Sequence, residues 1–205
     1  MRPLSCLDDN SALLVVDTSA AINLNASGCA EEILLALPYK ITIVDAIQRE
    51  LEFGRERGRR DAELTSSLVA ANRIEVASLG DEGWTHFELL VTGTAAETLD
   101  DGEAATIAYA VEHSGVAIID EHKATKICAI RYPSLVIASS LDLFGHPMVC
   151  ELLGRERLAE AVFLALRDAR MRVFRRHYEW VLDLIGADRA ALCPSLPRTL
   201  RDRWR

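Results

Sequence analysis

Four acidic residues stand at positions where a catalytic cation site could form. Asp17 ends the apolar run LLVV and Asp120 ends the run VAII, while Glu50 and Glu103 lie in helix-like segments. Clustered carboxylates repel one another, and a divalent cation removes that penalty. Mg²⁺ and Mn²⁺ prefer such hard oxygen ligands and commonly bridge to substrate phosphates. The chemistry that the four acids would support is attack of an activated water on a phosphodiester.

The acids can converge only if strands and helices alternate along the chain. Apolar and β-branched runs predict five strands, at residues 12–16, 40–44, 73–77, 116–119 and 135–139. Helical spacing predicts helices from residue 18 onward and at 46–54, 62–71, 81–90, 102–113 and 121–130. Such alternation indicates a mostly parallel sheet, whose site lies outside the carboxyl ends of the strands. Strand ends and helix starts share that edge, so we expect the four carboxylates to meet there.

Each acid alone also fits a structural role. Asp17 and Asp120 follow strands and could cap the next helix. Glu50 could be a solvated helix residue, and Glu103 could interact with the helix dipole in a first turn. The hypothesis of a cation site therefore rests on the set rather than on any single residue.

Three segments that contain these acids resemble a known family. VVDTSAAINL, IVDAIQREL and LDDGEAATIAYAVEHSGVAIIDEHKA resemble the motifs of PIN domains, the metal-dependent ribonuclease fold of VapC-type toxins. The resemblance covers roughly residues 12–145, and the GEA form is similar to one subgroup. It implies an α/β fold, a three-layer α/β/α sandwich with a mostly parallel central sheet. It also implies an Mg²⁺ or Mn²⁺ cofactor, an RNA substrate, a homodimer and an antitoxin partner.

The resemblance also implies roles for individual residues. Asp17, Glu50, Glu103 and Asp120 would be the catalytic acids and would hold the metal directly or through water. Ser19 would support a ligand carboxylate or a metal-bound water, although local helix capping explains it equally well. Asp100 and Asp101 crowd the third motif. Asp101 is either a ligand or the helix N-cap, and we prefer Glu103 as the ligand.

Charge is distributed unevenly along the chain. The net charge is −8, but residues 151–205 carry 12 arginines, no lysine and 8 acids. Residues 1–150 therefore carry the acidic excess. We predict a PIN-like nuclease domain over 1–150 and a helical, arginine-rich C-terminal extension over 151–205.

An acidic site repels RNA, so basic residues elsewhere must contact the phosphates. The candidates nearest the acids in the sequence are Arg55, Arg57, Arg59, Arg60, Lys123 and Lys126. Five arginines between residues 167 and 176 form a rival surface. Both clusters could instead be solvated helix faces with ion pairs.

These patterns leave two classes of function. The first is an Mg/Mn-dependent endoribonuclease, a hydrolase that is the toxin of a toxin–antitoxin pair. The second is a non-catalytic α/β nucleic-acid-binding or regulatory protein; a receiver-like domain is disfavoured because the first strand ends in one acid rather than a pair. There is no signal-peptide pattern and no apolar run long enough for a membrane span, and the five scattered cysteines form no CxxC pair. We therefore expect a cytoplasmic protein that does not enter a membrane.

Overall fold

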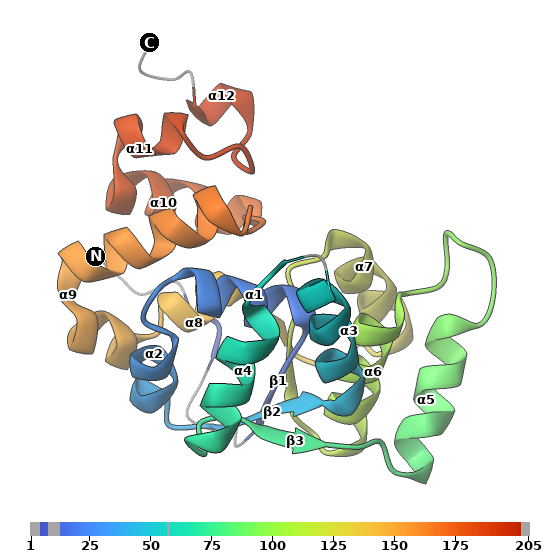
Figure 1. Cartoon of the computed structure of the whole chain (residues 1–205). Coiled ribbons are helices and arrows are strands. Elements are labelled where there is room, and N and C mark those ends of the chain that lie inside the picture. Colours follow the sequence, from blue (N-terminus) through green and yellow to red (C-terminus); the bar gives the residue numbers. More distant parts are fainter. Residues whose placement is uncertain (1–4, 8–12, 57, 202–205) are drawn as a thin grey trace.

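A computed structural model describes residues 5–7, 13–56 and 58–201. The chain forms a three-layer α/β/α sandwich around a five-stranded parallel sheet (Figure 1). The sheet order is β3-β2-β1-β4-β5. The strands are β1 (Leu13–Val16), β2 (Lys40–Val44), β3 (Glu75–Ala77), β4 (Val116–Ile118) and β5 (Ile137–Ala138). The predicted fold class is confirmed.

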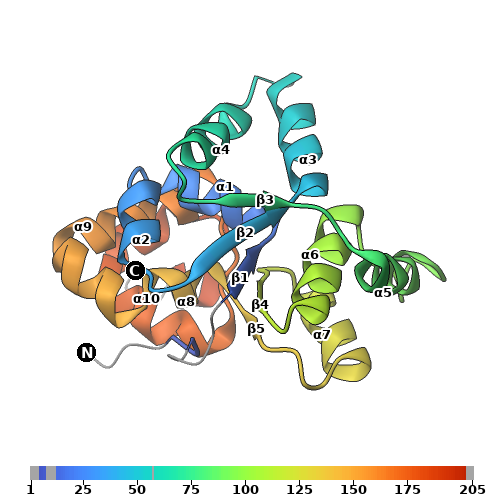
Figure 2. The same ribbon diagram turned by 90° about the horizontal axis from the view of Figure 1, so that it is seen from below.

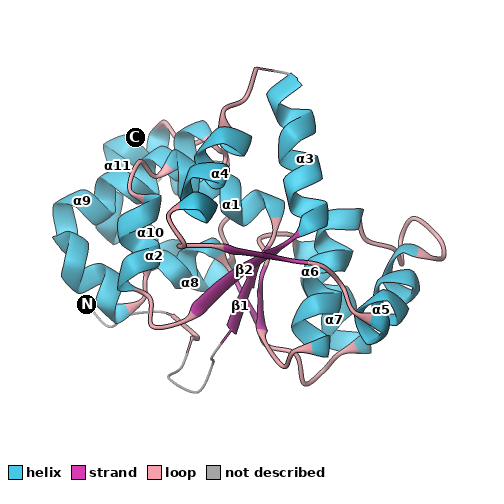
Figure 3. Cartoon of the chain, turned by 60° about the horizontal axis from the view of Figure 1, so that its bottom comes forward, coloured by secondary structure: helices cyan, strands magenta, loops and turns pink. Residues whose placement is uncertain are grey.

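Alternate residues of the strands face the two helical layers. Leu14 and Val16 belong to one buried cluster, whereas Val15 between them belongs to the other, as the period of two in a strand requires. Figures 2 and 3 show the layers on either side of the sheet. Helices that contribute to the first cluster are α1 (Thr18–Ala26), α2 (Ala30–Ala36), α3 (Asp45–Glu56), α4 (Asp61–Ala70), α8 (Ser140–Phe144), α9 (Pro147–Asp168), α10 (Tyr178–Ile185) and α11 (Ala187–Ala191). Those that contribute to the second are α5 (Asp81–Val91), α6 (Asp101–Glu112) and α7 (His122–Arg131).

Three predicted strands are shorter than expected: β4 ends at Ile118, one residue early, and β3 and β5 begin late for local reasons. β3 begins at Glu75 because the Arg73 amide still donates to the Leu68 carbonyl and closes α4. β5 begins at Ile137 because the Leu135 amide donates to the Tyr132 carbonyl in a turn. The predicted helices are all present, and α3 continues two residues beyond its predicted end at Gly54.

The strand order reverses its direction between β1 and β4. These two strands are hydrogen-bonded neighbours although they are distant in the sequence. The Asp17 amide donates to the Ile118 carbonyl at 3.2 Å and joins the two strand ends. In open α/β sheets a crevice at such a switch point is where ligands bind, so the topology directs attention to Asp17 and Asp120.

Helix α9 carries the chain from the sheet into the C-terminal region. It crosses position 150, the predicted domain boundary, and has a break in helical geometry at Gly154. Val149 before the boundary and Leu158 and Val162 after it lie in the same hydrophobic cluster as Leu14. The hydrophobic core therefore continues across residue 150, and the division into two domains stays a prediction. Of the helices described, none is long and apolar enough to cross a membrane.

The last part of the chain consists of short elements. After α9 come a 3₁₀ turn (Arg175–His177), α10, α11 (Ala187–Ala191) and α12 (Arg198–Arg201). Arg176 and His177 contact Asp142 of α8, at 2.7 and 3.4 Å. Although burial raises the pKa of Asp142, hydrogen bonds from His177 and Ser139 outweigh that effect and lower it. These contacts to the buried Asp142 tie the C-terminal region to α8.

Candidate active site

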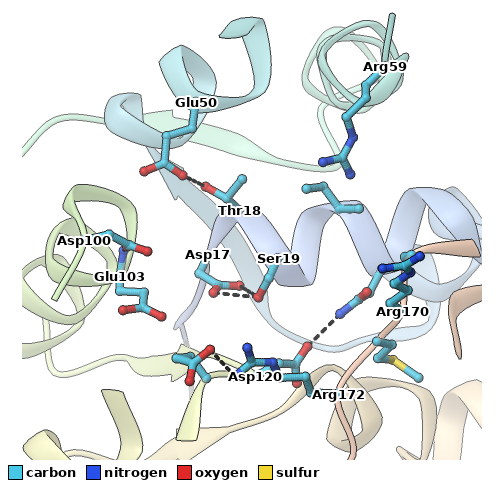
Figure 4. Close-up of a pocket in the computed structure, with 15 residues that line it drawn as sticks. Asp17, Thr18, Ser19, Glu50, Arg59, Asp100, Glu103, Asp120, Arg170 and Arg172 are labelled. Atoms are coloured by element: carbon cyan, nitrogen blue, oxygen red, sulfur yellow. Dashed lines mark hydrogen bonds and ion pairs between the residues drawn. The ribbon is translucent and has the colours of Figure 1, made fainter. Parts of the chain in front are cut away.

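A cavity of about 380 Å³ lies at the carboxyl edge of the sheet, beside the switch point. It contains all four acids predicted from the sequence (Figure 4). Its lining residues are Asp17, Thr18, Ser19, Ile22, Asn23, Glu50, Arg59, Asp100, Glu103, Asp120, Glu121, Ala169, Arg170, Met171 and Arg172. The parallel topology therefore brings together carboxylates from β1, α3, α6 and β4.

Asp17 is held at the end of β1 with only 3% of its surface exposed. It caps α1, because its Oδ1 accepts from the Ala20 amide at 2.7 Å. The Ser19 hydroxyl donates to its Oδ2 at 2.8 Å. Burial raises the pKa of Asp17 well above its usual range, and the nearby Asp120 adds to the effect. The helix-cap role and a site role are thus compatible in one residue, and Ser19 supports the carboxylate.

Asp120 is fixed by hydrogen bonds to both of its oxygens. The Ser140 amide donates to Oδ1 at 2.9 Å, and the Asn23 side chain donates to Oδ2 at 2.7 Å. The Ser140 hydroxyl also donates to Oδ2. Burial raises the pKa of Asp120, while the bonds from Ser140 and Asn23 oppose the rise. The carboxylate is therefore held in one orientation at the switch point.

Glu50 reaches the cavity from α3 and meets the first turn of α6. The Thr18 hydroxyl donates to its carboxylate. Burial raises the pKa of Glu50, although this bond and the Gly102 amide counteract it. A Cβ at Gly102 would lie only 2.6 Å from Glu50 Oε1. The glycine of the GEA segment is therefore required for the close approach of Glu50.

The third motif contributes Glu103 and Asp100 to the cavity lining. Asp100 is the N-cap of α6, and its side chain accepts from the Glu103 amide at 2.9 Å. The capping role that the sequence left open for Asp101 therefore belongs to Asp100. Asp101 is exposed and lies outside the cavity lining. Burial, with repulsion from Asp100 and Glu121, raises the pKa of Glu103 to about 7.

The donor set fits a divalent cation that keeps part of its water shell. Among the described residues, no group of three or more His, Cys, Asp or Glu side chains is placed to hold a metal ion by itself. Mg²⁺, however, is usually bound through one or two carboxylates and several waters. The pKa values of Asp17, Glu50, Glu103 and Asp120 are all raised. A cation would offset this cost of crowded, buried carboxylates.

The predicted RNA-binding residues separate in the structure. Arg59 lines the cavity, whereas Arg55 and Arg60 pair with Glu52 and Glu63 on their own helices. Lys123 donates to the Ala95 carbonyl at 2.7 Å. Lys126 lies outside the lining set, and Arg57 lies outside the described residues. Of the named basic residues that the structure describes, only Arg59 lines the cavity.

Several residues of the cavity were not identified as site residues from the sequence. They include Thr18, Asn23 and Glu121, together with Ser140 behind Asp120, whereas Arg170 and Arg172 belong to the rival arginine surface predicted from the sequence. Asn23 had one signal, since it is a polar residue beside the apolar Ala20, Ala21 and Leu24 on the buried face of α1. Thr18 and Ser140 have no local signal, because their roles depend on contacts with the distant Glu50 and Asp120.

A parallel α/β/α sandwich with acids gathered at its switch point is a fold and site suited to cation-assisted chemistry. A family model described as a PIN domain matches residues 13–187, and the chain belongs to the PIN domain family. PIN domains are typically nucleases, and those nucleases generally use a divalent metal. No curated protein and no solved structure matches the chain significantly.

Proposed function

We propose that this protein is a metal-dependent endoribonuclease that hydrolyses RNA phosphodiester bonds. The observation that carries the proposal is the meeting of Asp17, Glu50, Glu103 and Asp120 around one cavity in a chain of the PIN family. The acids come from four separate elements, and each has a raised pKa. Perturbed carboxylates gathered in one cleft are typical of a functional site.

The four acids have different proposed tasks. Asp17 and Asp120, buried and fixed by hydrogen bonds, bind the cation. Glu50 and Glu103, from α3 and α6, complete the site directly or through water. Mg²⁺ or Mn²⁺ would supply an activated water and stabilise charge on the phosphodiester. Thr18, Ser19, Asn23 and Ser140 orient the carboxylates.

The resemblance to VapC-type toxins supports a proposal about the cellular role. We propose that the chain is the toxin of a toxin–antitoxin pair, that it forms a homodimer, and that an antitoxin blocks the cavity. All five cysteines are free thiols, which agrees with the proposed cytoplasmic location. Coexpression with the protein of a neighbouring gene, followed by copurification, tests the antitoxin; light scattering tests the dimer.

The activity is tested by incubating the purified chain with a mixed RNA pool. Cleavage is expected with Mn²⁺ or Mg²⁺ and is lost with a chelator. Asp120→Asn serves as the matched inactive variant, because Asn keeps the shape of the side chain. Cleavage equal in wild type and Asp120→Asn would point to a contaminating nuclease. RNA binding without any cleavage by the wild type would favour the non-catalytic alternative.

A further inference from the structure

The segment that follows α9 forms one wall of the cavity. Residues 169–172 all line it, although they lie some fifty residues beyond Asp120, the last of the four predicted site acids. Two of the four are arginines, Arg170 and Arg172. In Figure 4, Arg59 and Arg170 lie on the side of the cavity opposite Asp100 and Glu103. The cavity therefore has an acidic wall and a basic wall.

The basic wall is built into the fold rather than attached loosely to it. Met171 is 1% exposed, and its amide donates to the Ala165 carbonyl at 3.0 Å. Val173 is also buried in the main hydrophobic cluster. Buried and exposed residues alternate from 170 to 173. Arg170 and Arg172 are therefore exposed, while the neighbouring Met171 and Val173 anchor the segment in the core.

The backbone at Arg170 is unusual. Its φ of +56° lies in the left-handed region, which residues other than glycine rarely adopt. Such a conformation costs on the order of 1 kcal/mol or more and persists only where the surroundings enforce it. A long cationic side chain thus stands where glycine would fit with less strain.

The arginines around the cavity differ in their partners. Arg172 pairs with Glu121, next to Asp120, and Arg59 pairs with Asp61 at 3.0 Å. Arg170 has no ion pair within the described part of the chain. Its guanidinium is therefore the cation most available to a ligand that enters the cavity.

We propose that Arg170 binds a phosphate of the RNA strand adjacent to the scissile one. The proposal rests on the proposed ribonuclease function and adds a contact to it. The planar guanidinium matches a phosphate in a two-bond geometry. The scissile phosphate lies at the acids, and its neighbour lies at Arg170, with Arg172 and Arg59 beside it. A strand held at both walls has its direction through the cavity fixed.

Binding is measured with a labelled single-stranded RNA in the presence of a chelator, so that no cleavage occurs. Arg170→Gly is the best variant, because glycine accepts the positive φ and the fold is retained. We expect roughly fivefold to twentyfold weaker binding, and a slope of log affinity against log salt that is shallower by about 0.7. Arg170→Lys should keep the salt slope and recover part of the affinity.

Arg175→Ala is the matched control. Arg175 is exposed and lies close to Arg172 in the sequence, but it is outside the cavity lining. Its removal deletes the same charge from the same region of the chain. Because Arg175 is outside the cavity lining, we expect RNA affinity and its salt slope to stay as in the wild type. Melting temperatures of all three variants establish that each is folded.

A second experiment locates the contact on the RNA. One phosphate at a time is replaced by a neutral methylphosphonate along the oligonucleotide. In the wild type, neutralising one phosphate beside the cleaved bond should weaken binding. Arg170→Gly should be insensitive to that same replacement and remain sensitive to the others, because two groups in contact are not additive.

The outcomes separate this inference from the function on which it rests. A wild-type chain that neither cleaves nor binds RNA overturns both. A wild-type chain that cleaves, with Arg170→Gly binding like Arg175→Ala, overturns only the role of Arg170. Weak binding by Arg170→Gly that still responds to every neutralised phosphate also overturns it, since no phosphate would then belong to that arginine.

Discussion

The Asn23 side-chain amide lies 2.7 Å from a carboxylate oxygen of Asp120, although 97 residues separate the two. The same amide lies 3.1 Å from the Ser140 hydroxyl, which also donates to Asp120. Asn23 on α1 and Ser140 on α8 therefore hold Asp120 from two helices. All three side chains are buried, so their hydrogen bonds are protected from water.

Removal of this amide should loosen Asp120. We expect Asn23→Ala to cost about 1–3 kcal/mol of stability, because a buried acceptor loses its donor. Mn²⁺ affinity, measured by calorimetry, should fall together with cleavage. Asn25→Ala is the control: Asn25 donates to Thr65 at 3.1 Å, away from the acids. If Asn25→Ala weakened Mn²⁺ binding as much, the positioning role of Asn23 would be lost.

The cation should stabilise the protein through Asp17. Asp17→Asn should keep the fold, since Asn is also a good N-cap. It removes one charge from a crowded group, so the metal-free variant should melt at the same temperature as wild type or higher. Mn²⁺ should raise the melting temperature of the wild type but not of the variant. Equal stabilisation of both by Mn²⁺ would contradict the assignment of Asp17.

A substitution at Gly102 should lower activity without lowering stability. Alanine is favoured over glycine in helices by about 1 kcal/mol, so Gly102→Ala should not destabilise α6. Its Cβ would lie 2.6 Å from Glu50 Oε1 and must displace that carboxylate. Cleavage should fall by roughly a hundredfold, as misplacement of a catalytic group by about 1 Å predicts.

The control for this variant is Gly83→Ala in α5. There the new Cβ would lie 2.4 Å from Glu112 Oε2, so the same kind of conflict occurs with a glutamate outside the cavity lining. Gly83→Ala should leave cleavage unchanged. Activity lost equally in both variants would show that the loss does not depend on the position of Glu50.

The metal-free protein should become less stable as the pH rises from about 5 to about 8. Glu103 has an ordinary pKa of 4.5 and a folded pKa of about 7, raised by burial and by Asp100. Between these values the folded chain binds more protons than the unfolded chain, so stability falls with pH. Glu103→Gln should flatten the change in melting temperature, measured with a chelator.

Asp101→Asn is the control for that titration, since Asp101 is exposed and outside the cavity lining. It should retain the wild-type pH profile and most of the cleavage activity. Mn²⁺ should bind the wild type more tightly as the pH passes about 7, because the cation displaces the Glu103 proton. A flat profile for Asp101→Asn and a steep one for Glu103→Gln would reverse our choice of acid.

Much of the fold could be read from local signals. Apolar runs that end in Asp17 and Asp120 predict both the strands and the edge at which they end. Parallel topology then places Glu50 and Glu103 at the same edge, because the helices that connect parallel strands begin at the edge where the strands end. These signals are local: each depends on a few neighbouring residues and on the direction of the strands.

The remaining parts of the site depend on contacts that no local pattern encodes. The contact of Thr18 with Glu50 requires α3 to pack beside α1. Arg55 and Arg59 both follow Glu50 closely in the sequence, yet of these two residues Arg59 lines the cavity and Arg55 does not. Arg170 reaches it because α9 returns over α1 and α2.

The acidic charge of the chain and the arginines of the cavity predict opposite effects of ionic strength on the rate of RNA association. A chain of net charge −8 repels RNA at a distance, and the range of that repulsion shrinks from about 30 Å at 0.01 M salt to about 8 Å at 0.15 M. Added salt therefore first speeds the encounter and then, at higher concentration, weakens the arginine contacts. Stopped-flow association rates should pass through a maximum, whereas a steady decline would mean that attraction by the arginines dominates at every range.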